Sequence, residues 1–247
     1  MSTLQTSTST GYRSSTARGR SSESGASRAP ARAASTAPRA SVSTPTTIST
    51  WPTNLNNRVQ VFSREGVLQR AWGGPGDGPG QLDLPWGVAV DTERNVFVAD
   101  WGNDRVQKFS PDGRVLASFG SSGQGDGQFD RPSCVAVDAE GVLYVSDWGN
   151  ERVPVLAPGG GFIEKLRGEA TPSKWADEFF EANPDEAAAR ARSNITPSLD
   201  PEVDTAYEES ARTEPYFWGP VSVKLDSHRR LYVTETNRHR IQVYETV

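Results

Sequence analysis

Short runs of β-forming residues, separated by turn residues, follow one another along the middle of this chain. In residues 85–121 four such runs occur, at 87–90, 95–99, 105–109 and 114–119. The connection from Ser110 to Gly113 places proline where a type I turn needs a preset φ, and glycine where the chain leaves the turn. The pattern predicts four short antiparallel strands joined as a meander.

The same arrangement recurs along the chain with a fixed period. Residues 132–168 repeat all four runs, residues 218–247 contain three of them, and residues 55–73 contain the last two. From Arg58 to Arg105 is 47 residues, a period that is typical of propeller repeats. A small sheet with two faces to cover must stack radially on its neighbours. We therefore expect an all-β fold, a β-propeller arc of about three four-stranded blades.

An eight-residue phrase marks three of the repeats. It begins at Asp100, Asp147 and Glu235, and a proline precedes the arginine of the phrase by the same distance in every copy. Asp and Asn at a turn between strands cap backbone N–H groups, and a catalytic constellation is not expected in every blade. We expect the recurring polar residues to be structural, and they are Asp100, Asn103, Arg105, Asp147, Asn150, Arg152 and Arg240.

Three sequence features resemble NHL repeats. They are the opening Pro-x-Gly-Val-Ala-Val-Asp at Pro85, the core Val-Ala-Asp-x-x-Asn-x-Arg-Val-Gln that ends at Gln107, and the linker Gly-x-Gly-Asp-Gly-Gln-Phe that ends at Phe129. The resemblance covers residues 56–168 and 218–247. It implies a six-bladed, TolB-like propeller, of which this chain is a partial or truncated member.

The resemblance also implies several possible functions. Some NHL propellers bind RNA through a basic face, some relatives are lyases with metal-bound histidine clusters, and animal relatives join the propeller to a RING finger. This chain has a single cysteine, Cys134, and two separated histidines, His228 and His239, so it can build neither a RING nor a histidine cluster. We expect no enzyme activity, no metal and no other cofactor. The alternatives are a fragment of a lyase- or hydrolase-like propeller enzyme and a substrate-recognition propeller linked to ubiquitin transfer.

Residues 169–215 interrupt the repeat between the third and fourth blade parts. The spacing from Arg152 to Arg240 is 88 residues, 41 more than the period. Thr171-Pro172 and Asn183-Pro184 are start signals for two helices. The insert is therefore predicted to be a helical hairpin. Its aromatic residues on one face of the first helix, which we expect to pack the helices onto the propeller, are Trp175, Phe179 and Phe180.

The connectivity of a meander places the tryptophans. Connections from second to third strand, and from fourth strand to the next blade, emerge on one face of a propeller. Four tryptophans and the helical insert belong to such connections, and aromatic side chains give large contact area at small entropic cost. We expect a protein partner to bind this insert-bearing face, through Trp86, Trp101, Trp148 and Trp218. For Trp86, as for Trp72, the alternative is that the ring fills a gap between blades.

Residues 1–54 differ in composition from the rest of the chain. They are mostly Ser, Thr, Ala, Arg, Gly and Pro without apolar periodicity, so we expect a disordered tail followed by the propeller at 55–247. The Arg-rich, acid-poor leader has the composition of an organellar transit peptide, and an unstructured tail or residues translated from a wrong start or frame are equally consistent with it. No secretory signal or membrane span is recognisable, so a soluble, cytoplasmic protein is the default expectation.

The charge of the chain and the open ends of the propeller arc both affect which partners we expect. After residue 50 the chain holds 20 basic and 30 acidic residues, and the insert alone holds four basic and 12 acidic ones. An acidic surface repels phosphate, so nucleic acid is an unlikely partner. An open arc has bare blade edges through which the chain could self-associate, and two chains could close a ring. The function we expect is a non-catalytic scaffold for protein–protein interaction.

Overall fold

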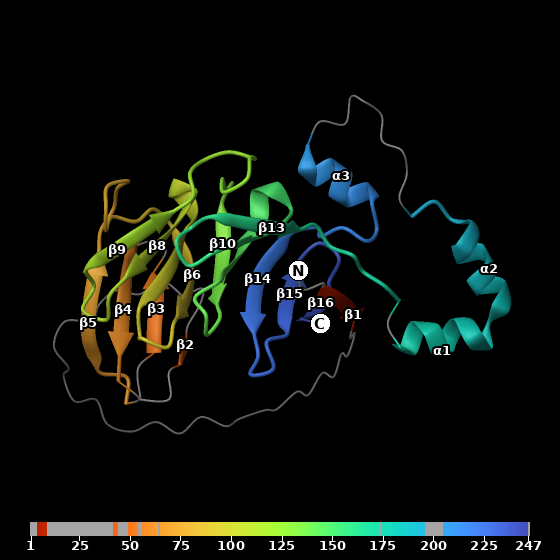
Figure 1. Ribbon diagram of the computed structural model, residues 1–247, viewed down its shortest axis with the longest axis horizontal. Coiled ribbons are helices and arrows are strands. Elements are labelled where there is room, and N and C mark those ends of the chain that lie inside the picture. The colour runs from red at the N-terminus through yellow and green to blue at the C-terminus, as the bar shows by residue number, and fades with distance from the viewer. Residues whose placement is uncertain are drawn as a thin grey trace, which may run out of the picture.

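The structure of the protein is a computed structural model. It describes residues 56–63, 65–172, 174–195 and 205–245 in full, together with the backbone of strands at 4–8, 42–43 and 49–53 and of residue 246. Within this part of the chain, strands β1 to β16 form four antiparallel sheets of four strands each. We name the sheets blades A to D in chain order. Figure 1 shows them side by side, from β5 at one end to β16 at the other.

Blades B and C each consist of four consecutive strands. Blade B contains β6 (Pro85–Val90), β7 (Val96–Asp100), β8 (Arg105–Phe109) and β9 (Val115–Phe119). Blade C contains β10 (Pro132–Val137), β11 (Leu143–Asp147), β12 (Val153–Leu156) and β13 (Phe162–Leu166). A short 3-10 turn joins second and third strands in both, η2 (Trp101–Asn103) and η3 (Trp148–Asn150). Both blades are the meanders that the sequence predicts.

Blades A and D are completed by strands from residues 1–54. Blade A contains β2 (Val42–Ser43), β3 (Ser49–Thr53), β4 (Arg58–Phe62) and β5 (Leu68–Gly73). Blade D contains β14 (Pro220–Leu225), β15 (Leu231–Glu235) and β16 (Ile241–Thr246), with β1 (Leu4–Thr8) paired to β16. The arc therefore has four four-stranded blades where the sequence predicts about three.

The strands β1, β2 and β3 come from the range 1–54, for which the sequence predicts a disordered tail. β1 pairs with β16 from Leu4–Thr246 to Thr8–Gln242, and β3 pairs with β4 from Ser49–Phe62 to Thr53–Arg58. The physical reason is the open sheet edge, because unpaired N–H and C=O groups of an edge strand accept almost any extended partner. The rest of residues 1–54, which includes all the arginines of the candidate transit peptide, lies outside the described residues.

The apolar cores lie between adjacent blades. β6 contacts β3 of blade A and β10 of blade C, and β10 in turn contacts β14 of blade D. Each linker between blades ends in one fully buried apolar side chain, and these residues are Leu82, Phe129 and Phe217. Leu82 packs in the cluster between blades A and B, Phe129 between B and C, and Phe217 between C and D. A blade is thus stable only against its neighbours, as expected for a propeller.

The described part of the insert, residues 169–172, 174–195 and 205–215, contains three helices. α1 (Lys174–Ala182) and α2 (Pro184–Arg192) form the predicted hairpin, and α3 (Ala206–Arg212) is an additional short helix. Figure 1 shows α3 above the blades, whereas α1 and α2 project sideways beyond blade D. No helix within the described ranges is long and apolar enough to span a membrane.

Candidate functional site

The repeat arginine of blade B holds the linker that precedes its own blade. Arg105 donates from Nε to the Asp100 carboxylate at 2.8 Å and from Nη1 to the Asp77 carbonyl at 2.6 Å. Its Nη2 donates to the carbonyls of Gly78 and Gln81, both at 3.0 Å. All three carbonyls belong to the glycine-rich linker. The planar guanidinium suits this task because it presents its donors in a fixed fork.

The other polar residues of the phrase reinforce this arrangement, which we call the linker clamp. Asn103 donates from Nδ2 to the Gly76 carbonyl and to Asp100, both at 2.9 Å. The second carboxylate oxygen of Asp100 accepts from the Asp83 backbone N–H at 2.7 Å. Gln107 adds a bond from its Nε2 to the Gln81 carbonyl at 2.6 Å. The side chains of Asp100 and Gln107 are fully buried, so the clamp is an internal polar network.

Blade C contains the same clamp one period later. Arg152 donates to Asp147 and to three linker carbonyls, while Asn150 donates to Asp147 and to a fourth; the carbonyls are those of Gln124, Gly125, Gln128 and Gly123. Burial raises the pKa of Asp147 to about 6 against the lowering effect of Arg152, Asn150 and the Asp130 N–H. Burial likewise raises the pKa of Asp100. Both raised pKa values therefore follow from the burial of these carboxyls inside the linker clamp.

Blade D uses different residues for the same purpose. Glu235 replaces aspartate and accepts from Arg240 Nε at 2.6 Å, and Arg240 donates from Nη2 to the Tyr216 carbonyl at 2.6 Å. Arg238, at the asparagine position, donates to the carbonyls of Ser210 at 2.6 Å and of Thr213 at 3.1 Å. Those carbonyls belong to the last turn of α3 and its C-cap. The substitution that sets this copy apart therefore fixes α3 to the propeller.

A second contact, which sequence reasoning missed, joins each blade to the next. The residue immediately before the repeat arginine lies in the left-handed region, at φ values of 48° for Asn57, 51° for Asp104 and 52° for Glu151. Its side-chain oxygen accepts from a backbone N–H at the entrance of the following blade. These bonds, which we call blade latches, are Asn57 to Leu84 at 3.0 Å, Asp104 to Arg131 at 2.7 Å and Glu151 to Gly219 at 2.5 Å.

The latch at Glu151 contains a carboxyl group with a raised pKa. Burial raises the pKa of Glu151 to about 7, the nearby Glu235 carboxylate raises it further, and the Gly219 N–H and Arg167 oppose both. A signal for the latches is present in the sequence, since a side chain with an acceptor oxygen precedes the arginine in three of the four copies. The exception is His239, in blade D.

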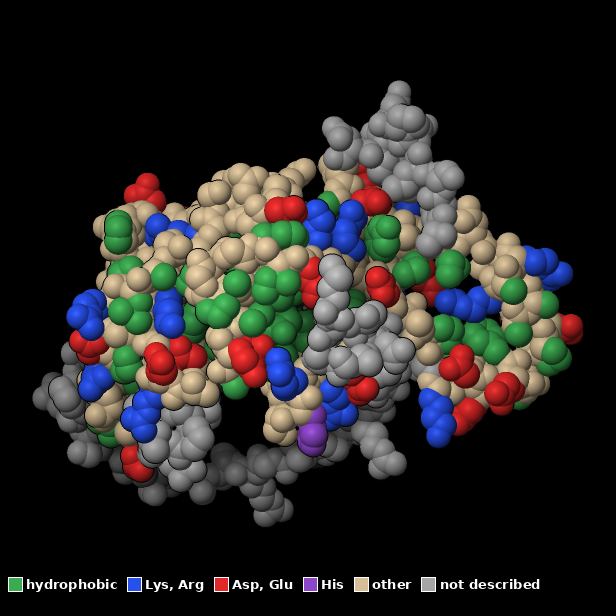
Figure 2. All heavy atoms as spheres, in the orientation of Figure 1, with side chains coloured by type: hydrophobic (Ala, Val, Ile, Leu, Met, Phe, Trp, Pro, Cys, Tyr) green, Lys and Arg blue, Asp and Glu red, His purple; other side chains and the backbone are tan. Residues whose placement is uncertain are grey.

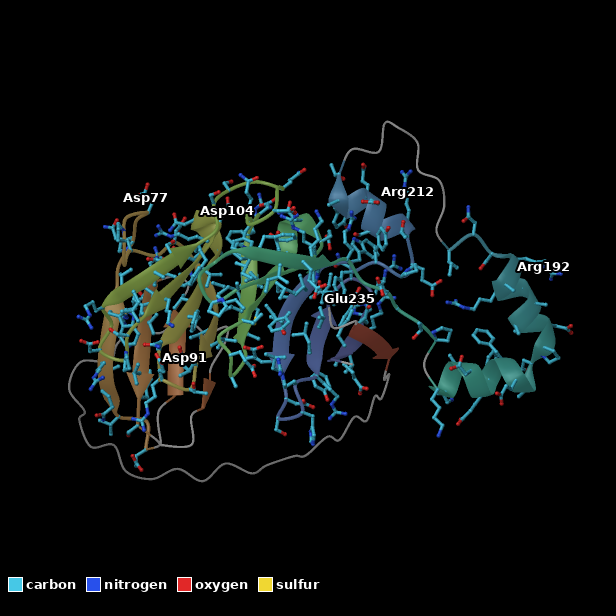
Figure 3. All side chains as sticks on the ribbon, in the orientation of Figure 1. Asp77, Asp91, Asp104, Arg192, Arg212 and Glu235 are labelled. Atoms are coloured by element: carbon cyan, nitrogen blue, oxygen red, sulfur yellow. The ribbon has the colours of Figure 1, made fainter. Side chains whose placement is uncertain are left out.

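Trp86 and Trp101 form an aromatic pair on the face that carries η2. Their ring centroids are 5.8 Å apart, and both side chains are half-buried. The guanidinium of Arg131 lies 5.5 Å from the Trp101 ring centroid, at a distance suited to a cation–π contact. The linker lies directly beneath, because the Gly102 N–H donates to the Asp83 carbonyl. Figure 3 shows Asp77, Asp104 and Arg212 along this same face, with Asp91 towards the opposite one.

The other two candidate tryptophans lie beside α3. Tyr207 of α3 meets Trp218 edge-to-face, with ring centroids 5.7 Å apart, and the Arg238 guanidinium lies 5.6 Å from the Trp218 centroid. α3 also contacts η3, the turn that begins with Trp148. The structure thus divides the four predicted binding residues into an aromatic pair, Trp86 and Trp101, and two residues next to a helix. Trp72 instead packs into the core between blades A and B, 6.1 Å from Phe109.

The aromatic residues of α1 do not pack onto the propeller as the sequence suggests. Trp175 and Phe179 stack with centroids 6.0 Å apart and remain 72% and 42% exposed. Phe180 points towards α2, where Arg190 lies 5.8 Å from its ring. The expectation was wrong because the hairpin leaves the blade sideways, so that only one of its aromatic rings has a helix to pack against. Figure 2 shows the projecting hairpin with hydrophobic and acidic side chains on its surface.

The described residues contain no group of three or more His, Cys, Asp or Glu side chains that could hold a metal ion. His228 lies in the turn after β14 and His239 in the turn before β16, so the two histidines occupy different loops. Cys134 is buried in the cluster between blades C and D. The turn that holds His239 corresponds in blade D to η2 and η3, whereas Cys134 is internal.

Comparisons with known proteins agree with this architecture. The model of the NHL repeat family matches residues 82–109, 129–156 and 217–244. A structural genomics protein of unknown function from Bacteroides thetaiotaomicron has a TM-score of 0.50 at 16% identity, over 81% of this chain and 44% of its own. An inactive virginiamycin B lyase from Staphylococcus aureus, solved with quinupristin, has a TM-score of 0.48 at 11% identity, over 83% of this chain and 54% of its own.

The chain thus spans only about half the length of these solved structures. Identities this low concern the fold alone and say nothing about activity. No curated protein sequence matches the chain.

Proposed function

Because this chain is built from NHL repeats folded as a β-propeller, we propose that it is a non-catalytic scaffold that binds a protein partner. The partner surface is the face formed by η2, η3, the linkers and α3. The observation that carries the proposal is the half-buried pair of Trp86 and Trp101, with Arg131 beside it. Tryptophan and arginine are the residue types most enriched at the energetic centres of protein interfaces.

The linker clamps support a scaffold and argue against catalysis at the recurring polar residues. Every donor of Arg105 and Arg152 that the structure describes is directed at an acid of its own blade or at linker carbonyls. A catalytic group must be able to exchange a proton or contact a substrate, whereas these groups are already engaged. Their role is to hold the loops that display the tryptophans.

Charge supports a protein partner over a nucleic acid. The insert, whose helix α3 borders this face, has 12 acidic and four basic residues between positions 169 and 215. A surface of this sign repels phosphate and has few cations with which to release counterions. Aromatic rings beside one guanidinium are suited to contact a protein surface that combines apolar side chains with carboxylate or carbonyl oxygens.

The proposal is tested by quantitative affinity capture with a double variant, Trp101→Ala with Trp148→Ala. The matched control is Leu116→Ala, which removes a side chain of β9 that is 45% exposed and lies outside the clamps. We expect the double variant to lose at least tenfold of the captured partner while the control retains it, with both proteins keeping the wild-type circular dichroism spectrum. Equal capture by the double variant and the wild type would contradict the proposal.

Metal analysis distinguishes the proposed scaffold from the enzymatic alternative. A lyase- or hydrolase-like propeller that depends on a metal should carry it in stoichiometric amount after gentle purification. We expect less than about one tenth of an equivalent of any transition metal, because the described residues offer no cluster of ligands. One full equivalent that survives dialysis would favour the enzyme instead.

A further inference from the structure

The residue after the repeat arginine lies on the side of each blade that faces the following blade. Val59 belongs to the cluster between blades A and B, Val106 to that between B and C, and Val153 to that between C and D. All three side chains are fully buried. Ile241 occupies the same position in blade D, yet its side chain is 40% exposed. Blade D therefore presents, at one end of the arc, an apolar side of the kind that a following blade covers elsewhere.

Blade A presents the opposite side of the repeat at the other end of the arc. The first residue of the fourth strand packs against the preceding blade in blade B, where it is Val115, and in blade C, where it is Phe162. Leu68 is the same position in blade A, 47 residues before Val115, and its side chain is 44% exposed. Blade A thus presents an apolar side of the kind that a preceding blade covers.

The glycine of the turn before the fourth strand gives a second observation on blade A. A Cβ on Gly113 would lie 2.8 Å from the Trp72 ring of blade A, and a Cβ on Gly160 would lie 2.8 Å from the Phe119 ring of blade B. Both turns therefore fit closely against the preceding blade. Gly66 is the same position in blade A, and a Cβ there would meet nothing within 4 Å. The strand and the turn of blade A are open at the same side.

The two open sides are the two halves of one repeated interface. Val59 and Val115 share the cluster between blades A and B, and Val106 packs in the same cluster as Phe162 between blades B and C. Ile241 and Leu68 are the counterparts of these pairs, but they lie at opposite ends of the arc. Figure 1 shows this separation, with β5 of blade A at one end and β16 of blade D at the other.

We propose that two copies of this chain join end to end, with blade D of each packed against blade A of the other. Ile241 of one copy then packs against Leu68 of the second copy, as Val59 packs with Val115 within the chain. A second copy fits because it already carries the side of the repeat that each open end requires. Propellers close with about four to eight blades, and two copies of four blades supply eight.

The end-to-end arrangement contains two identical contacts. Such a head-to-tail interface forms a closed ring when its rotation closes, and the second contact is then intramolecular. The ring is consequently more stable than one contact alone. This interface is separate from the tryptophan face and does not depend on the function proposed for that face.

Sedimentation velocity of the full chain measures the assembly across a concentration series. We expect a dimer with twice the 26.8 kDa mass of one chain, in reversible equilibrium with the monomer. Ile241→Glu and Leu68→Lys each place a charge in both contacts of the ring, so each should weaken dimer formation at least tenfold, because an unpaired charge is costly to bury. The matched control Ile163→Glu, at a side chain of β13 that is 52% exposed, should leave the dimer unchanged.

A mixture of the two variants tests the head-to-tail arrangement. In a mixed pair one contact keeps Ile241 and Leu68, and the other sets the introduced carboxylate against the introduced ammonium, so dimers should form again. Recovery in the mixture also shows that both variants are folded. The proposal is overturned if the wild-type protein is monomeric throughout or forms an assembly larger than a dimer. It is equally overturned if only one of the two variants weakens the dimer, or if the mixture does not recover it. Neither substitution touches the tryptophan face, so failure here leaves the function of that face standing.

Discussion

Replacement of Arg152 by alanine tests whether the linker clamp holds a blade together. The side chain is 5% exposed and donates four hydrogen bonds, to Asp147 at 2.8 Å and to the carbonyls of Gln124, Gly125 and Gln128 at 2.7, 3.0 and 2.9 Å. Alanine removes all four donors at once. It also leaves the Asp147 carboxylate buried beside Asn150 without its cation.

The expected magnitude follows from these contacts. Removing one partner of a buried ion pair costs about 3–5 kcal/mol, since the remaining charge stays desolvated. The three carbonyls lie in a surface linker and regain water in part, so we expect a loss of about 4 kcal/mol in the free energy of unfolding. For a domain of this size about 2–4 °C of melting temperature corresponds to 1 kcal/mol, which gives a decrease of roughly 8–16 °C. Arg152→Lys keeps the charge but cannot reach every carbonyl, so its melting temperature should fall between those of wild type and Arg152→Ala.

Differential scanning calorimetry measures the effect, with Lys165→Ala as the matched control. Lys165 forms an ion pair with Asp126 at 3.1 Å in the same blade and linker, but both side chains are about half exposed. Exposed pairs contribute less than about 1 kcal/mol, so the control should melt within about 3 °C of wild type. If Arg152→Ala also melts within this interval, the clamp does not stabilise the blade and the reasoning is refuted.

Three further predictions concern the contacts between blades and the attachment of α3. Glu151, whose pKa is raised from 4.5 to about 7 by burial, favours the folded state fully below about pH 4.5 and loses this contribution as pH rises through 7. Chemical unfolding should therefore show stability falling between pH 4.5 and pH 8, and Glu151→Gln should reduce this fall by about 3 kcal/mol while leaving the part that Asp147 contributes; an unchanged profile would contradict the burial of the Glu151 carboxyl. Gly87→Ala should destabilise the protein by about 2–3 kcal/mol in urea titration, because a Cβ there would lie 2.5 Å from Cys134 Cα, while Gly159→Ala, in open space, should be nearly neutral. Arg238→Ala should accelerate amide hydrogen exchange in residues 206–213 but not in β14, since it frees the carbonyls of Ser210 and Thr213; equal exchange in the variant and the wild type would show that α3 is held by other contacts.

Much of the fold was predictable because its strands are marked twice, by apolar alternation and by the repeated phrase. β6 to β13 lie where the 47-residue period places them, and the helices α1 and α2 follow proline-containing start signals. The burial of Leu82, Phe129 and Phe217 was not predicted, although the sequence contains a signal for it. Leu82 and Phe129 are one period of 47 residues apart, and Phe129 and Phe217 are separated by one period plus the insert. Repetition carries this information because each blade faces the same packing problem as its neighbour.

Other features depend on tertiary contacts that a local pattern does not contain. β1, β2 and β3 have no apolar alternation. β1 forms on the open edge of β16, at the far end of the chain, while β2 and β3 extend the sheet edge of the neighbouring β4. α3 was missed although Thr205 caps it by accepting from the Glu208 N–H, a signal present in the sequence as Thr-x-x-Glu. The exposure of Trp175 was also unpredictable, because hydrophobic periodicity shows that a helix has an apolar side but not what covers it.

The most direct test of the account is hydrogen–deuterium exchange of the protein alone and with its captured partner. If the partner binds the face of the aromatic pair, protection should appear at residues 83–87, 101–104 and 131, beside the Trp86 and Trp101 rings. The turns on the opposite face, at 91–95, 138–142 and 226–230, should exchange at the same rate in both states. Protection confined to those turns, with none around Trp86 and Trp101, would contradict the assignment of the binding face.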